Sequence, residues 1–194
     1  MLLRTLLGQV DHLNGAIDEL SAEIGRRLEP YEAAVALLCS IAGVQRRVAE
    51  VVLAEIGPDM GRFADARHLC SWAAICPGNH ESAGKRRSGR LRHGNRALRA
   101  ALLQAAWSAI RVKDSYFGAQ FRRIAKRRGP KRAAIAVAHS LLTVIYHVLS
   151  RGVFFEDLGA DYFDRRRPEQ HARYHVRRLA ELGFNATLEP IEAA

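Results

Sequence analysis

Apolar residues spaced alternately three and four positions apart open the chain and restrict what its first part can form. They are Leu3, Leu6, Val10, Leu13, Ile17, Leu20 and Ile24. Because the residues between them are mostly polar, one narrow stripe of a helix is apolar, which is typical of a coiled coil. We therefore expect a coiled-coil helix over residues 1–30, paired either within the chain or with a second chain. An amphipathic helix packed on the chain's own core fits the pattern equally well.

Helical spacing of apolar residues continues along the rest of the chain, and no clear run shows the period of two that is typical of strands. We predict an all-α fold with a helical domain over residues 31–152 and a C-terminal part over 153–194, which contains an aromatic-anchored loop and a basic helix. The longest apolar stretch, Ala133 to Leu149, is interrupted by polar residues and is shorter than the roughly 20 residues of a membrane span. We expect this stretch to be a central core helix, and we expect no membrane partner.

A tight turn at residues 41–45 separates two helical patterns. Helix, turn and helix in this order resemble a helix-hairpin-helix element, which presents backbone N–H groups to a DNA phosphate. Gly43 is then a candidate DNA contact. Gln45 stands where such an element usually has a second glycine, so Gly43 is equally well explained as a turn residue.

Two clusters of basic residues indicate a nucleic-acid partner. The first lies in a glycine-rich loop and the start of the following helix, and comprises Lys85, Arg86, Arg87, Arg90, Arg92, Arg96 and Arg99, with Asn95 at the helix start. The second comprises Arg122, Arg123, Lys126, Arg127, Arg128, Lys131 and Arg132. The chain has 30 Lys and Arg against 20 Asp and Glu, a net charge of +10. Guanidinium groups and helix starts bind phosphates, whereas a solvated basic surface is the alternative interpretation.

The cysteines and histidines do not predict a metal site. Cys39, Cys70 and Cys76 are odd in number and show no C-x-x-C spacing, which fits the reduced cytoplasm better than a disulfide framework. His139 and His147 lie eight positions apart and are more typical of polar groups within a core than of metal ligands. We therefore expect no metal and no other cofactor to be bound by this chain.

Several short motifs together resemble the C-terminal half of a bacterial transposase family. They are Ile41-Ala42-Gly43-Val44, Gly57 through Phe63, Cys76-Pro77, Ser82-Ala83-Gly84-Lys85, Gly94-Asn95-x-x-Leu98-Arg99 and Gly159-Ala160-Asp161-Tyr162-Phe163. The family comprises insertion-sequence enzymes with an N-terminal acidic, resolvase-like domain and a C-terminal serine domain, described as bridge-RNA-guided recombinases. The resemblance covers nearly the whole chain.

This resemblance implies that Ser82 is a nucleophile that attacks a DNA phosphodiester and forms a covalent phosphoserine link. Lys85, Arg86 and Arg87 would stabilise the charge that develops at the phosphorus. DNA and a guide RNA are the implied partners, and Mg²⁺ would be held by carboxylates of the acidic domain. Because this sequence lacks such a domain, we expect DNA or RNA binding but little or no strand transfer from the chain alone. A non-catalytic helical module that only binds DNA phosphates is the alternative.

Overall fold

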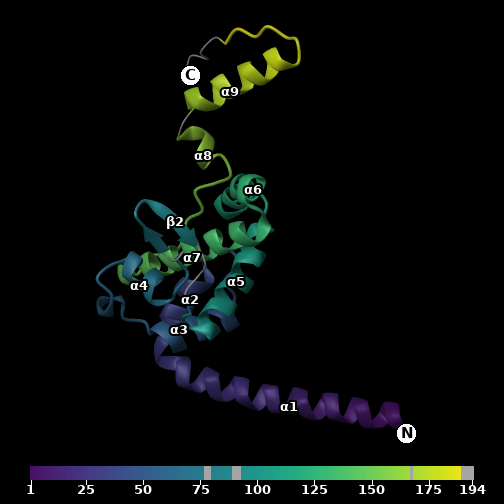
Figure 1. Cartoon of the computed structure of the whole chain (residues 1–194). Coiled ribbons are helices and arrows are strands. Elements are labelled where there is room, and N and C mark those ends of the chain that lie inside the picture. Colours follow the sequence, from purple (N-terminus) through teal and green to yellow (C-terminus); the bar gives the residue numbers. More distant parts are fainter. Residues whose placement is uncertain (77–79, 89–92, 167, 189–194) are drawn as a thin grey trace.

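The computed structural model describes residues 1–76, 80–88, 93–166 and 168–188. Helices dominate these residues, which confirms the predicted all-α class (Figure 1). A long N-terminal helix leads into a helical core, and two further helices follow the core. The helices are α1 (Leu2–Leu28), α2 (Glu32–Cys39), α3 (Arg46–Ile56), α4 (Ala66–Trp72), α5 (Arg96–Ile110), α6 (Tyr116–Arg128), α7 (Pro130–Arg151), α8 (Tyr162–Arg165) and α9 (Pro168–Glu181), with 3-10 turns η1 (Glu29–Tyr31) and η2 (Met60–Arg62).

Two short antiparallel strands, β1 (His80–Ser82) and β2 (Lys85–Ser88), form a hairpin between α4 and α5. The sequence predicted a loop at this place, so the hairpin corrects that prediction. The strands have three and four residues, which is too short for an alternation of apolar and polar residues to stand out.

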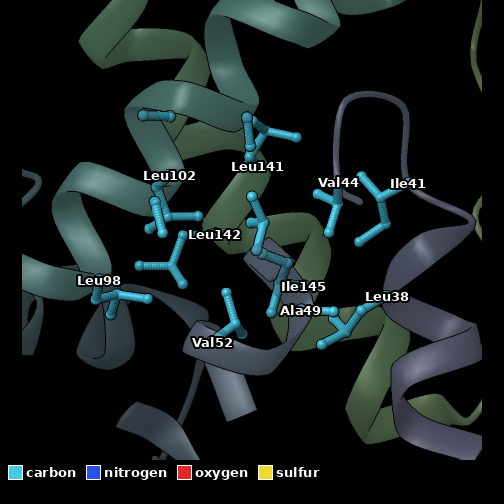
Figure 2. Close-up of a cluster of buried hydrophobic side chains, with 14 of the residues drawn as sticks. Leu38, Ile41, Val44, Ala49, Val52, Leu98, Leu102, Leu141, Leu142 and Ile145 are labelled. Carbon is cyan, nitrogen blue, oxygen red and sulfur yellow. The ribbon is translucent and has the colours of Figure 1, made fainter. Parts of the chain in front are cut away.

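α7 is the central helix of the core, as its apolar sequence predicted. It contacts α2, α4, α5 and α6. Its length and hydropathy are also sufficient for a membrane span, but its apolar side chains pack against the other helices. Figure 2 shows its residues Leu141, Leu142 and Ile145 among side chains of α3 and α5, which include Val52, Leu98 and Leu102.

α1 extends away from this core as a single helix (Figure 1). None of its residues is buried, and Leu13 and Leu20 are 60% and 64% exposed. The described part of the chain therefore leaves the apolar stripe uncovered, which contradicts both packing on the chain's own core and pairing within the chain. Only the end of the helix is attached: Leu28 packs against the core, and Arg47 of α3 donates a hydrogen bond to Oγ of Ser21 at 2.9 Å.

Aromatic residues attach the segment after α7 to α6. The ring of Tyr116 stacks on Phe163 with centroids 5.1 Å apart, and Phe117 stacks on Phe155 at 5.8 Å. The backbone N–H of Tyr116 also donates to Oδ1 of Asp157 at 2.8 Å. These contacts fix the chain up to α8, beyond which α9 projects from the core (Figure 1).

Candidate active site and nucleic-acid interface

The hairpin places Ser82 next to its turn. Ser82 is the last residue of β1, and Lys85, the first residue of β2, is its direct partner across the two strands. Between them, Ala83 and Gly84 have φ angles of 51° and 72°. Positive φ at both central residues is the geometry of a type I′ turn, whose twist matches that of the strands it joins. The backbone therefore holds Ser82 at the tip of a tight hairpin, opposite a basic residue.

The other basic residues predicted around Ser82 are only partly described. Lys85 is exposed. Arg86 and Arg87 follow it on β2, where Arg86 is the register partner of Glu81, but their side chains, like that of Ser82, lie outside the described part of the structure. Arg90 and Arg92 lie outside the described residues entirely. A cationic cluster at Ser82 therefore stays a prediction beyond the position of Lys85.

Gly94 holds the far end of the hairpin segment against the core. A Cβ atom at this position would overlap the Cβ of Ala74 and lie 2.8 Å from the carbonyl oxygen of Ala73. No residue larger than glycine fits without a shift of the backbone. Since Ala73 and Ala74 directly follow α4, this contact brings together the two ends of the segment that contains the hairpin.

Asn95, which the sequence predicted to bind nucleic acid, forms hydrogen bonds within the chain. Its Oδ1 accepts from the backbone N–H of Leu98 at 2.9 Å and so caps α5. Its side-chain nitrogen donates to Oε2 of Glu55 in α3. Asn95 therefore connects α5 to α3, and we interpret it as a residue that positions the hairpin. Arg96 and Arg99 follow in the first turn of α5, where Arg96 is exposed and Arg99 is half-buried.

Gly43 faces the core. It has a φ angle of 84°, and a Cβ there would lie 2.5 Å from both the carbonyl oxygen of Ala105 and the backbone nitrogen of Ala109. The turn between α2 and α3 therefore packs closely on the backbone of α5, with Ile41 and Val44 buried on either side of the glycine. This packing accounts for a glycine at the turn, in agreement with the alternative interpretation from the sequence. The likeness to a helix-hairpin-helix element is limited to the order of helix, turn and helix.

The second basic cluster lies on α6 and the first turn of α7. All seven of its side chains are exposed. The guanidinium of Arg123 lies 4.4 Å from the centre of the Phe163 ring. Within the described residues, ion pairs to acidic side chains are made by other arginines. This surface therefore presents positive charge that acidic neighbours among the described residues do not neutralise, as a phosphate-binding surface requires. The alternative is a structural role, because cations near the C-terminus of α6 interact favourably with the helix dipole.

Neither a second nucleophile nor a metal centre stands out in the core. Cys70 of α4 is buried, with its Sγ 3.7 Å from Oγ1 of Thr143. Burial raises the pKa of this thiol to about 11, so it stays protonated and unreactive at neutral pH. Burial also lowers the pKa of His139. Among the described residues, no three His, Cys, Asp or Glu side chains gather to hold a metal ion.

Residues 35–122 match the model of the IS116/IS110/IS902 transposase family. The match begins in α2, ends in α6 and includes the hairpin. The chain is also 28% identical over 120 residues to a protein of Sinorhizobium fredii (strain NBRC 101917 / NGR234), whose name, transposase y4pF/y4sB, is itself provisional. The aligned part covers 59% of this chain and 31% of that relative, so the match spans about a third of the relative's length. Both comparisons support a transposase family.

Sequence reasoning missed the residues that fix the hairpin segment within this transposase-like region. Glu55 lies 40 positions before its partner Asn95, and Ala73 and Ala74 lie beyond the hairpin from Gly94. Contacts between residues so far apart leave no periodic pattern in the sequence. The only local signal is a Gly-Asn pair before an apolar helix, which is typical of a helix start.

Replacing Gly94 with Ala is expected to lower the free energy of unfolding by roughly 1–3 kcal/mol, because the new methyl group collides with the chain after α4. Urea unfolding followed by circular dichroism measures the loss. Gly15→Ala is the matched control, since nothing lies within 4 Å of that position and alanine favours a helix. Equal stability of the Gly94→Ala variant and the native chain would show that the ends of the hairpin segment are not held together.

Proposed function

We propose that this chain is the serine-bearing part of a transposase and that Ser82 is its nucleophile. The two comparisons support the transposase class. The observation that carries the choice of residue is the position of Ser82 at the tip of the hairpin, directly opposite Lys85. A residue at such a tip is reached by a rigid DNA backbone more easily than one within the helical core.

In the proposed reaction, Oγ of Ser82 attacks the phosphorus of a DNA phosphodiester. An O–P bond to serine forms, the bond to one deoxyribose oxygen breaks, and the serine proton leaves to a base while that oxygen becomes a hydroxyl. Attack by a DNA hydroxyl on the phosphoserine then joins the strand and restores the serine. The phosphoserine link conserves the energy of the broken bond, so joining needs no further energy source.

Lys85 is the residue we propose to stabilise the charge on the phosphorus during this attack. Directly opposed residues of antiparallel strands lie with their Cα atoms about 4.5–5.5 Å apart, so a lysine there can reach a phosphate held at Ser82. A positioned cation stabilises a phosphoryl transition state where its negative charge develops. Arg86 and Arg87 continue the same strand and extend the positive charge.

We further propose that DNA, and a guide RNA with it, lies across the exposed cluster on α6 and α7 and the start of α5. Positive side chains that release counterions from phosphates bind nucleic acid with little dependence on sequence. We propose that Mg²⁺ is held by carboxylates of a separate acidic domain, that the chain self-associates through α1, and that the reaction takes place in the cytoplasm.

A test combines the full chain with an acidic domain of the same transposase family and a DNA substrate. We expect protein–DNA adducts that survive detergent and are destroyed by protease, and mass spectrometry of the digested adduct should place the nucleotide on Ser82. DNA binding that weakens steeply with salt, without any adduct, would instead support the non-catalytic binding module. A nucleotide on any other residue would contradict the assignment of Ser82.

A further inference from the structure

We infer that Trp107 of α5 is a stacking site for an unpaired base, so that the surface formed by α5 and α6 holds a single-stranded segment of nucleic acid. The inference deepens the nucleic-acid surface proposed above and rests on it. Its starting point is an exposed aromatic side chain in a strongly basic part of the chain. Positive charge attracts any nucleic acid, whereas an aromatic ring binds the flat face of a base, which is accessible when the base is unpaired.

The indole of Trp107 is held in place by the neighbouring helix α6. Trp107 is 42% exposed, and its ring packs edge to face on the ring of Phe121, with centroids 5.7 Å apart and planes inclined by 64°. Phe121 is itself half-buried between α6 and the rest of the core. The contact orients the indole while leaving part of its surface in solvent. A ring held in this way loses little freedom when a base stacks on it.

Arginines from both helices lie close to this indole. Arg111 follows Trp107 by four positions, which is one helical turn along the same face, and it is exposed. Arg122 comes from α6. Its Nη1 atom lies 3.4 Å from the position that a Cβ would take at Gly118, and the carbonyl oxygen of Ile110 lies 3.3 Å from the same point. The guanidinium of Arg122 is therefore next to the last turn of α5, to which Trp107 belongs, and can bind the phosphate of a stacked nucleotide.

The charge around the indole favours a polyanion as its partner. The sequence from Ser82 to Phe155 contains 17 Lys and Arg but one acidic residue, Asp114, which lies in the turn between α5 and α6 beside Lys113. Neither α5 nor α6 contains an Asp or a Glu. A surface of this composition attracts phosphates along its whole length. Aromatic rings set among cations are the combination that binds single strands without reading their sequence.

The chain's other tryptophan, Trp72 at the end of α4, provides an internal comparison. It is 49% exposed and packs edge to face on Phe63, with centroids 5.8 Å apart, so its exposure and its aromatic partner match those of Trp107. The stretch that carries these two rings, residues 59–72, contains two Asp and two Arg, so its charges balance. Exposure of an indole is therefore common to both sites, while a surplus of positive charge is specific to Trp107.

Fluorescence of the full chain tests the stacking directly, because a stacked base quenches an indole and the two tryptophans can be read separately. Trp72→Phe leaves Trp107 as the reporter, and Trp107→Phe leaves Trp72. We expect oligo(dT) or oligo(U) of about 12 nucleotides to quench the first variant and not the second. A response to one oligomer alone would name the strand as DNA or RNA. No response to either, equal quenching of both tryptophans, or equal quenching of Trp107 by an unbroken duplex would overturn the inference.

Affinity measurements separate stacking from packing. Trp107→Leu keeps an apolar side chain against Phe121 but removes the indole. Its affinity for the single strand that quenches should fall roughly 5- to 100-fold, the scale of one stacked base, while its affinity for a duplex of the same length stays unchanged. Trp107→Phe should lose less because it keeps a ring, and the matched control Trp72→Leu should bind like the native chain.

Equal losses of affinity for single strand and duplex in Trp107→Leu would overturn the stacking site while leaving the basic surface in place. Urea unfolding of the same variant shows whether the helices still pack, so a folding defect is recognised as the cause of a general loss. Adduct formation at Ser82 is measured separately. Failure of the proposed chemistry is therefore distinguishable from failure of the stacking site.

Discussion

Gly43→Ala is expected to lower the free energy of unfolding by roughly 2–5 kcal/mol, the sum of two independent costs. An alanine with a φ angle near the 84° of Gly43 adopts a left-handed conformation, which costs roughly 1–2 kcal/mol. Its methyl group would also collide with backbone atoms of Ala105 and Ala109. Because these belong to a helix that cannot move aside by changing a rotamer, overpacking adds about 1–3 kcal/mol. Urea unfolding followed by circular dichroism measures the total.

Gly152→Ala separates the two costs. Gly152 has φ and ψ angles of 65° and 32°, in the left-handed region, and nothing lies within 4 Å of the position its Cβ would take. This variant should lose only the first cost, so the difference between the two variants measures the close approach of the turn to α5. Equal losses would contradict that close approach. Reduced DNA affinity of Gly43→Ala with unchanged stability would instead support the phosphate contact that the sequence predicted.

The spacing of apolar residues along the sequence predicted individual helices. The spacing from Leu3 to Ile24 predicted α1, and the apolar run from Ala133 predicted α7, because the period of a helix can be recognised within a short stretch of sequence. The same patterns could not say what covers each helix. The stripe of α1 fitted a coiled coil and a core helix equally well, and the described chain shows only that its own core does not bury α1.

The sequence predicted which residue is the candidate nucleophile, but it did not predict how that residue is positioned. Ser82 came from the resemblance to a transposase family, whereas its position opposite Lys85 depends on a turn in which Ala83 has a positive φ angle. Sequence propensity disfavours an alanine in that conformation, so a loop was the natural prediction. The roles of Gly94 and Asn95 depend on contacts with Ala73, Ala74 and Glu55 across the core. The basic residues and the start of a helix suggested phosphate binding here. In the structure, close packing explains Gly94 and helix capping explains Asn95.

The two groups of basic residues, in the hairpin and on α6, are expected to act in different steps of the reaction. The hairpin and the α6 cluster lie in different parts of the sequence, and the hairpin has a serine whose direct register partner is a lysine. We therefore expect the α6 cluster to set affinity and its salt dependence, and the hairpin to set the rate of strand cleavage. Substitution of the nucleophile separates these contributions most sharply.

Ser82→Ala is expected to slow the formation of covalent DNA adducts by roughly 10³-fold or more, the scale on which loss of a nucleophilic serine acts. The reaction is that of the chain supplied with an acidic domain, and the rate is read from detergent-resistant adducts over time. DNA affinity should stay unchanged, because the substitution removes one hydroxyl and no charge. A large loss of rate with constant affinity is the signature of a group that acts in the chemical step.

Ser88→Ala is the matched control because it removes a hydroxyl from the same hairpin. Ser88 ends β2 and is the register partner of His80, at the opposite end of the strands from the turn. If the hairpin only binds phosphates, the two variants should behave alike and retain whatever activity the native chain has. Adducts that persist in Ser82→Ala would show that another group attacks the DNA. A loss confined to Ser82→Ala would show that the hydroxyl beside the turn, and not the hairpin as a basic surface, performs the reaction.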